Sequence, residues 1–231
     1  MTKALDFTSG YDSRRPPMLG HNAVATSQPL AAQAGMKMLQ LGGNAVDAAI
    51  ATAMALTVVE PTGNGIGSDA FAIVWDGEKL HGLNASGRSP ASWHADLFAG
   101  KSAVPEIGWD AVTVPGAVSG WVALAERFGT LPLTTLAQPA IDYARNGFPV
   151  SPLIGHLWQR GYSKLKDQPG FSACFAPEGR APRVGEIFRN PAQANSLELI
   201  ARTNGEAFYR GELAQKIAAF AREHGAHLTA E

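Results

Sequence analysis

The sequence predicts an α+β fold, because helical patterns fill most of the chain and one segment has the signature of a β-hairpin. In the helical segments, apolar and small residues recur at three- and four-residue spacing. In the hairpin segment, the β-prone runs 71–75 and 80–85 flank Asp76-Gly77, a dipeptide that favours a tight primed turn. We expect both hairpin strands to be internal to the fold.

The first two helices are predicted from their spacing and their end signals. Residues 28–41 form the first, and Gly42-Gly43 is its expected C-terminal stop. Asn44 suits the N-cap of the second helix, with Asp47 in its first turn. That helix continues to Val59 with small residues around its circumference, so it should be buried among close neighbours. At about 20 Å it is too short to cross a bilayer.

The later helices are predicted by the same spacing, with glycine stops and proline in first turns. They are one between Gly116 and Gly129, one over 134–146 ended by Gly147, one opening at Ser151-Pro152, one opening at Asn190-Pro191, and one over 206–224 with a break near Gly211. Thr134, Ser151 and Asn190 are the expected N-caps. Residues 167–185 are expected to be loop.

Composition excludes several classes of protein. With 231 residues, 45% hydrophobic and 17% charged, the chain is expected to be globular. A net charge of −1 and scattered basic residues give no footprint for nucleic acid or anionic membrane. The first residues hold no apolar run long enough for a signal peptide, so the protein is predicted to be cytoplasmic. The single Cys174 excludes an internal disulfide and is expected to be a buried or partly buried bystander.

The cofactor-binding motifs fail when their context is checked. The glycine-rich segment 63–71 lies between a helix and a strand, whereas a dinucleotide or P-loop site follows a strand and opens a helix. Gly100-Lys101-Ser102 lacks the leading glycine of a Walker loop, where Ala95 stands. The six histidines have no metal-ligand spacing and are expected at the surface or at helix caps. Thr134-Thr135 could be nucleophilic only if an N-terminal amine were exposed there. No cofactor and no metal are predicted.

Arg88 is the candidate binding residue. It follows the second hairpin strand within residues 84–90, where small flexible residues surround one cation. A guanidinium in such a place can hold a carboxylate through two parallel hydrogen bonds. An exposed arginine that pairs with a nearby acid explains the pattern equally well.

Taken together, a set of short motifs resembles the γ-glutamyltransferase family. They are residues 25–31, 42–49, 59–61, 65–67, 87–90, 114–116, 139–141, 146–150, 207–211 and 228–231, in the order that this family shows. The likeness runs from about Ala23 to Glu231, and the combination is far more specific than any one element.

The resemblance implies an N-terminal-nucleophile (Ntn) hydrolase, an αββα sandwich made as a precursor that cuts itself before a threonine. That threonine attacks a γ-glutamyl or related amide, with its own α-amine as the base. The family motif Thr-Thr-His does not occur here, so the nucleophile is expected beyond Glu231 and no catalytic residue lies in this chain. Function would therefore belong to the complete protein.

The resemblance also implies a domain plan and partners. Residues 1–22 would be an N-terminal arm, and residues 23–231 the single-domain front of a large subunit, truncated at its C-terminus. The expected partners are a small-molecule amide and the protein's own C-terminal small subunit, with a possible homo-oligomer of the processed heterodimer. Nucleic acid and membrane are not expected partners.

For the site, the resemblance implies that Arg88 binds the α-carboxylate of the glutamyl donor. Ser68-Asp69-Ala70 departs from the glycine run of the family and looks closer to cephalosporin acylases. Asp69 would either disfavour an acidic acyl group or satisfy backbone donors, and the second role is preferred. The leading hypothesis is a γ-glutamyltransferase-like amide hydrolase or acyltransferase. The alternatives are a glutaryl or cephalosporin acylase and a non-catalytic remnant that binds a ligand or partner.

Overall fold

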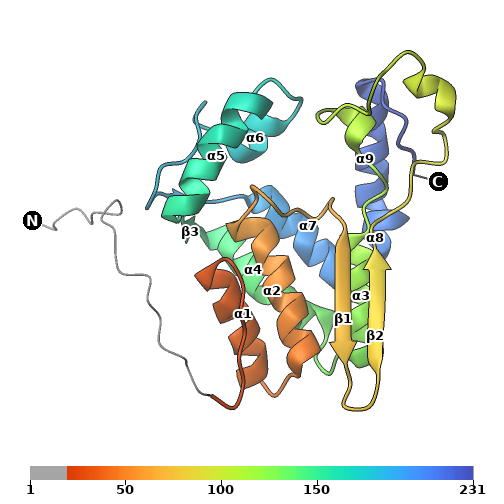
Figure 1. Cartoon of the computed structure of the whole chain (residues 1–231). Helices are drawn as coiled ribbons and strands as arrows, with labels where there is room; N and C mark the ends of the chain where they lie inside the picture. The colour runs from red at the N-terminus through yellow and green to blue at the C-terminus, as the bar shows by residue number, and fades with distance from the viewer. Residues whose placement is uncertain (1–19, 231) are drawn as a thin grey trace, which may run out of the picture.

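Helix α2 (Ala45–Val59) lies at the centre of the structure, a computed structural model that describes residues 20–230. It contacts α1 (Pro29–Gln40), α3 (Ala117–Phe128) and α4 (Leu133–Asn146), as Figure 1 shows. Ten of its 15 residues are buried, so the predicted burial holds for most of the helix. It does not hold on every side, because Ala45 and Ala49 are exposed on one face. The predicted N-terminal arm, residues 1–22, lies outside the described residues except for its last three.

The remaining helices extend this bundle towards the C-terminus. Helix α7 (Pro191–Arg202) packs on α4 and leads through α8 (Glu206–Tyr209) to α9 (Glu212–Glu223), so the predicted break near Gly211 is confirmed. Two short 3₁₀ helices, η1 (Ala95–Phe98) and η2 (Trp109–Ala111), lie in the long connection between the hairpin and α3. Over residues 20–230, no helix has both the length and the hydropathy to cross a membrane.

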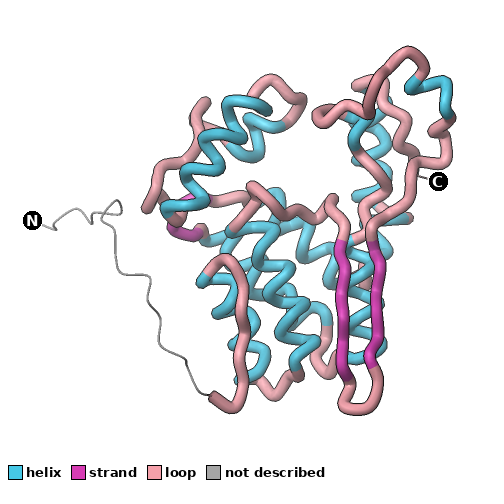
Figure 2. Tube along the Cα trace, in the orientation of Figure 1, coloured by secondary structure: helices cyan, strands magenta, loops and turns pink. Residues whose placement is uncertain are grey.

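The hairpin consists of β1 (Ala70–Trp75) and β2 (Leu80–Ala85), paired antiparallel with Trp75 opposite Leu80. Gly77 has φ +105°, and Asp76 Oδ1 accepts hydrogen bonds from the amides of Glu78 and Lys79, so the turn centres on Gly77-Glu78. One face of the hairpin packs on α3. Figure 2 shows the two strands along one side of the bundle.

The other face of the hairpin, which we call the open face, is exposed. The prediction that both strands are internal is therefore wrong for this chain. Its large side chains are Phe71, Ile73, Trp75 and Leu80, which are 65%, 79%, 62% and 62% exposed. Alternation along a strand places these side chains opposite those that contact α3. The sequence shows a β-prone apolar run, and such a run does not tell which chain covers its second face.

The hairpin turn is tied to α3 through one histidine. His81 Nε2 lies 2.7 Å from Asp76 Oδ2, and Arg127 Nη2 of α3 lies 2.9 Å from His81 Nδ1. Arginine can only donate, so Nδ1 accepts and the Nε2 proton points to Asp76. Hydrogen bonds from Glu78 N, His81 and Lys79 N hold the pKa of the Asp76 carboxyl far below its usual range.

Helices α5 (Pro152–Leu165) and α6 (Phe171–Phe175) form a separate layer beside the bundle. The two-residue strands β3 (Phe148–Pro149) and β4 (Ile187–Phe188) pair at its base. The indole of Trp158 packs on Phe188 with ring centroids 4.7 Å apart and donates to Phe175 O at 2.9 Å. The segment 167–185, predicted to be loop, contains the short helix α6. This helix was missed because five residues are too few to show a helical period.

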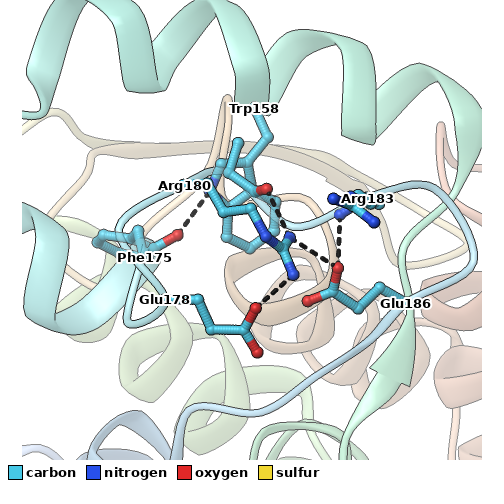
Figure 3. A network of polar contacts seen from close by, with 7 residues as sticks. Trp158, Phe175, Glu178, Arg180, Arg183 and Glu186 are labelled. Carbon is cyan, nitrogen blue, oxygen red and sulfur yellow. Dashed lines mark hydrogen bonds and ion pairs between the residues drawn. The ribbon is translucent and has the colours of Figure 1, made fainter.

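An ionic network holds the segment that follows α6 (Figure 3). Arg180 pairs with Glu178 and with Glu186, the latter at 2.9 Å, and Glu186 also accepts from Arg183 N at 2.9 Å. Partial burial would raise the pKa of the Glu186 carboxyl, but the hydrogen bonds from Arg183 and Arg180 outweigh it and hold this pKa below its ordinary value. The network is structural, because it satisfies its own charges.

Helix starts follow the predicted N-cap residues in three cases out of four. Asn44 Oδ1 accepts from Val46 N and Asp47 N, and Asn190 Oδ1 accepts from Gln193 N, as predicted. Thr134 is not a cap, since α4 begins at Leu133 after Pro132. Ser151 is the N-cap residue before Pro152, as predicted, although its side chain makes no capping hydrogen bond. Proline fixes the backbone at both starts, so a side-chain cap is not needed to set the boundary.

The fully buried Asp47 connects the start of α2 to the end of α3. Its carboxylate accepts from Asn44 N at 2.8 Å, from Thr130 N at 3.0 Å, from Thr130 Oγ1 at 2.5 Å and from Leu131 N at 3.3 Å. Burial would raise the pKa of this carboxyl, but the hydrogen bonds from Thr130, Asn44 and Leu131 outweigh it and lower the pKa. Asn44 adds a bond to Phe128 O at 2.6 Å.

Candidate functional site

Three segments that are distant in the sequence meet at the end of the hairpin where β1 begins and β2 ends. They are the glycine-rich loop 63–69, the Arg88 segment 86–90 and the turn 114–117 that opens α3. Gly116 N and Ala117 N both donate to Ser68 O, at 3.1 and 2.9 Å, and Val114 N donates to Arg88 O at 2.9 Å. We call this meeting of main chains the seam. It fixes the backbone of Arg88 against the start of a helix.

Two glycines are required at the seam because the main chains approach so closely. Gly87 has φ +77°, and a Cβ there would lie 1.9 Å from Val114 O. A Cβ at Gly116 would lie 2.0 Å from Ala85 O. Such distances are far inside van der Waals contact, so any side chain at either position would push the strand end away from the turn.

Arg88 extends from this seam as an exposed side chain. Its backbone carbonyl is held, but within residues 20–230 its guanidinium makes no hydrogen bond and no ion pair. The sequence left open that Arg88 pairs with a nearby acid. Within the described part of the chain, no such ion pair is formed. A fixed backbone with a free cation can accept a carboxylate from a ligand.

Asp69 is the second exposed charge at this end of the hairpin. The preferred expectation was that its carboxylate satisfies backbone donors, and this is wrong for the described residues. Ser68, not Asp69, closes the loop: its Oγ donates to Gly65 O at 2.6 Å and its amide donates to the same carbonyl at 3.1 Å. The Asp69 carboxylate accepts from no described donor, so it carries its charge freely next to β1.

Sequence reasoning missed Tyr209, which touches the seam from α8. The Tyr209 hydroxyl donates to Pro115 O at 2.8 Å and accepts from Ser119 N at 2.9 Å. The segment 207–211 contributed to the family resemblance, but nothing in it connects residue 209 with residue 115. A groove of about 680 Å³ lies beside Tyr209 and is lined by α3, α8 and the chain near Thr229, without Arg88.

The other candidate groups do not add to the site. Within residues 20–230, no group of three His, Cys, Asp or Glu side chains is placed to hold a metal ion. Lys101 pairs with Asp110 at 2.6 Å, and its glycine-lysine-serine segment follows η1 instead of a strand. Cys174 is exposed, which corrects the expected burial: it lies on the five-residue α6, none of whose residues is buried. His224 caps the end of α9 through Phe220 O, one of the predicted histidine roles.

Comparison with known proteins identifies the family to which the chain belongs. The family model for gamma-glutamyltranspeptidase matches residues 31–231. The glutathione hydrolase-like YwrD proenzyme of Bacillus subtilis is 40% identical over 89% of this chain and 40% of its own length. The oxamate amidohydrolase proenzyme of Klebsiella pneumoniae is 36% identical over 86% of this chain and 39% of its own. The chain thus spans less than half the length of these relatives.

Solved structures agree with the sequence matches. The cephalosporin acylase from Bacillus halodurans superposes with a TM-score of 0.85 at 51% identity, covering 95% of this chain and 44% of that one. The γ-glutamyltranspeptidase of Helicobacter pylori gives a TM-score of 0.88 at 27% identity, covering 94% of this chain and 64% of that one. The predicted α+β class and the likeness to Ntn hydrolases, over part of their length, are confirmed. This chain belongs to the γ-glutamyltranspeptidase family.

Proposed function

We propose that this chain is the front part of the large subunit of a γ-glutamyltransferase-like amide hydrolase or acyltransferase, and that the whole protein acts on γ-glutamyl or similar carboxylated small amides. The observation that carries the substrate class is Arg88, whose backbone is held at the seam while its guanidinium has no partner among residues 20–230. Family membership and relatives named as proenzymes support the reaction class.

In this proposal the chemistry itself lies outside residues 1–231. The hydroxyl of an N-terminal threonine attacks the amide carbon, its proton passes to the threonine α-amine, and that proton is delivered to the leaving amine. The acyl-enzyme is then resolved by water or by a second amine. Arg88 contributes by holding the acyl part of the substrate in one orientation, which lowers the entropic cost of the attack.

We propose the protein's own C-terminal subunit as the partner that covers the open face of the hairpin. Phe71, Ile73, Trp75 and Leu80 expose a contiguous apolar strip on a sheet of two strands, and both outer strand edges are unpaired within the described residues. Such strips and edges are normally covered. More than half the length of the relatives named above lies outside the part that this chain matches, which leaves ample polypeptide to cover them.

Asp69 favours a γ-glutamyl donor over a glutaryl donor. A free carboxylate at the same end of the hairpin as Arg88 attracts the α-ammonium that a γ-glutamyl group carries and a glutaryl group lacks. The second candidate, an acylase for dicarboxylic side chains, is supported by the likeness to a cephalosporin acylase. The two differ in whether the amine next to the carboxylate matters.

Replacing Arg88 by Ala in the complete enzyme is expected to weaken carboxylated substrates selectively. We expect kcat/KM for a γ-glutamyl anilide to fall by about 10- to 150-fold, the scale of one charge-assisted hydrogen-bonded contact, about 1.5 to 3 kcal/mol. The 4-aminobutyryl anilide, which keeps the amine and lacks the carboxylate, should be hydrolysed at the same rate by both enzymes. A glutaryl anilide, which keeps the carboxylate and lacks the amine, separates the two candidate functions in the wild type.

Arg160→Ala is the matched control, because Arg160 is also exposed and lies on α5, away from the seam. It should leave all three substrates unchanged. Equal losses for the carboxylated and the uncarboxylated anilide in Arg88→Ala, or no loss at all, would remove Arg88 from the binding site.

A further inference from the structure

The hydroxyl of Tyr209 bridges two main-chain groups of the turn that opens α3. It donates to Pro115 O at 2.8 Å and accepts from Ser119 N at 2.9 Å, so one side-chain atom closes the turn from outside. Ser119 Oγ adds an internal bond to Gly116 O at 2.7 Å. The amide of Ser119 belongs to the first turn of a helix, where the amides have no partner inside the helix.

This turn is the same one that holds the Arg88 segment. Val114, directly before Pro115, donates to Arg88 O, and Gly116, directly after it, donates to Ser68 O. Gly87 and Gly116 leave no free space in which the strand end could shift against the turn. A displacement of residues 114–117 would therefore be passed on to the backbone of Arg88.

The position of Tyr209 is fixed by packing and hydrogen bonds around α8. Its neighbour Phe208 is buried, and the two rings meet edge to face with centroids 5.2 Å apart. The start of α8 is anchored by Thr203 Oγ1, which accepts from Ala207 N at 3.1 Å and donates to Leu199 O on α7 at 2.8 Å. The hydroxyl thus connects α8, which packs on α7, to the seam.

We infer that Tyr209 is a positioning residue for Arg88, so that it sets the affinity for the carboxylate of the substrate without touching the substrate. This inference rests on the proposed function, in which Arg88 binds that carboxylate. Loss of the hydroxyl leaves Pro115 O and Ser119 N without their partner and lets the turn move. The guanidinium would then be placed less well, while the threonine chemistry elsewhere would be unchanged.

The test is Tyr209→Phe in the complete enzyme, with Tyr143→Phe as the matched control. Tyr143 also donates from its hydroxyl to a main-chain carbonyl, Leu30 O at 3.1 Å, but it joins α4 to α1. For Tyr209→Phe we expect KM for the γ-glutamyl anilide to rise about fivefold, the scale of one lost hydrogen bond, with kcat nearly unchanged. KM for the 4-aminobutyryl anilide should not move, and the control should change neither substrate.

A double-mutant cycle with Arg88→Ala separates positioning from a general loss of structure. In the Arg88→Ala background, Tyr209→Phe should have no further effect on the γ-glutamyl anilide. Full additivity, or an equal rise in KM for both anilides, would overturn the inference. Ser119→Ala, which removes the bond to Gly116 O in the same turn, provides a second variant should Tyr209→Phe not mature.

Hydrogen exchange distinguishes failure of this inference from failure of the proposed function. The Ser119 and Val114 amides should lose protection in Tyr209→Phe and keep it in Tyr143→Phe. If Arg88→Ala leaves the γ-glutamyl anilide unaffected, the role of Arg88 and the inference both fail. If Arg88→Ala has its expected effect but Tyr209→Phe changes neither exchange nor KM, only the inference fails.

Discussion

At the scale of single residues, Asp47 shows how one buried carboxylate joins two helices. It accepts hydrogen bonds from Asn44, which is three residues away, and from Thr130 and Leu131, which are more than 80 residues away in the sequence. Gly43 and Gly129 make room for it, since a Cβ at either would lie 3.1 or 3.0 Å from a carboxylate oxygen. The Asp47 carboxylate is fully buried, and the hydrogen bonds that it accepts offset the cost of removing its charge from water.

Asp47→Asn is expected to lower the free energy of unfolding at neutral pH by about 1 to 3 kcal/mol, because an amide replaces one accepting oxygen with a donor group. The folded pKa of Asp47 is lowered, so its stabilising contribution is complete above the unfolded pKa of about 3.9 and is lost as the pH falls through the folded value. Acid titration of the unfolding midpoint should therefore be flatter for Asp47→Asn than for the wild type.

Asp96→Asn is the control for this measurement, because the Asp96 side chain is 94% exposed. It should shift the midpoint little at any pH. Parallel acid titrations for the wild type and Asp47→Asn would contradict the assigned role of the buried carboxylate.

At the scale of secondary-structure elements, the hairpin separates what local sequence determines from what it does not. The strand boundaries and the glycine turn follow from alternation and from Asp76-Gly77, and the structure has them within one residue of the predicted positions. The partner of each face does not follow. Phe71 and Ile73 would suit a buried core equally well if another sheet lay against them. The expectation of internal strands is therefore wrong for this chain taken by itself, in which both side chains are exposed.

Ile73→Lys in the complete protein tests whether the open face is covered there. Ile73 is 79% exposed in this chain, so a lysine would cost little if the face stayed open. Covered by the second subunit, the same lysine would bring an unpaired charge into an apolar contact. We expect accumulation of unprocessed precursor and a loss of at least about 2 kcal/mol of stability.

The comparison variant is Glu78→Lys, which introduces the same side chain at the exposed hairpin turn. It should mature normally. Equal maturation of the two variants, measured by gel and by unfolding midpoint, would mean that nothing packs on the open face.

Helix prediction succeeded where patterns were long and failed where boundaries were set by other means. The second helix was predicted with its Asn44 cap because capping is local and because its 15 residues are rich in alanine, the strongest helix former. The short α6 and the two-residue β3 and β4 could not be predicted, because such short segments show no period and because β3 and β4 lie far apart in the sequence. Thr134 was misread since Pro132 already sets the start of that helix.

At the scale of the whole molecule, the chain spans less than half the length of the relatives named above, and its candidate site joins segments that are far apart in the sequence. Arg88 was selected from its place after a strand among small residues, and its role in binding a carboxylate, which the family resemblance implies, stays a prediction. The seam was not identifiable, because the contacts of Ser68, Gly87 and Tyr209 with residues 114–119 join segments far apart in the sequence. Likewise, the hydrogen bond between Tyr209 and Ser119 joins residues 90 positions apart, so no local sequence pattern predicts it.

Denaturing intact-mass measurement of the protein purified from its natural source tests the proposed precursor. We expect two polypeptides, the second beginning with threonine, as autoprocessing before a nucleophile requires. A lone species at the 24.3 kDa of this sequence would instead favour the non-catalytic remnant. An unprocessed single chain of greater mass, fully active on the anilides, would contradict the N-terminal nucleophile.

The close contact between Gly87 and Gly116 also decides which positions near Arg88 can be varied in the proposed enzyme. A mutant library that varies positions 69, 86, 88 and 89 alters exposed side chains and leaves the main chain where it is. A library that includes positions 87 or 116 would consist mainly of misfolded members, because a single methyl group there meets a carbonyl oxygen at about 2 Å. Loop grafts from related acylases should therefore carry both glycines across as a pair, since the strand end and the helix start can only be exchanged together.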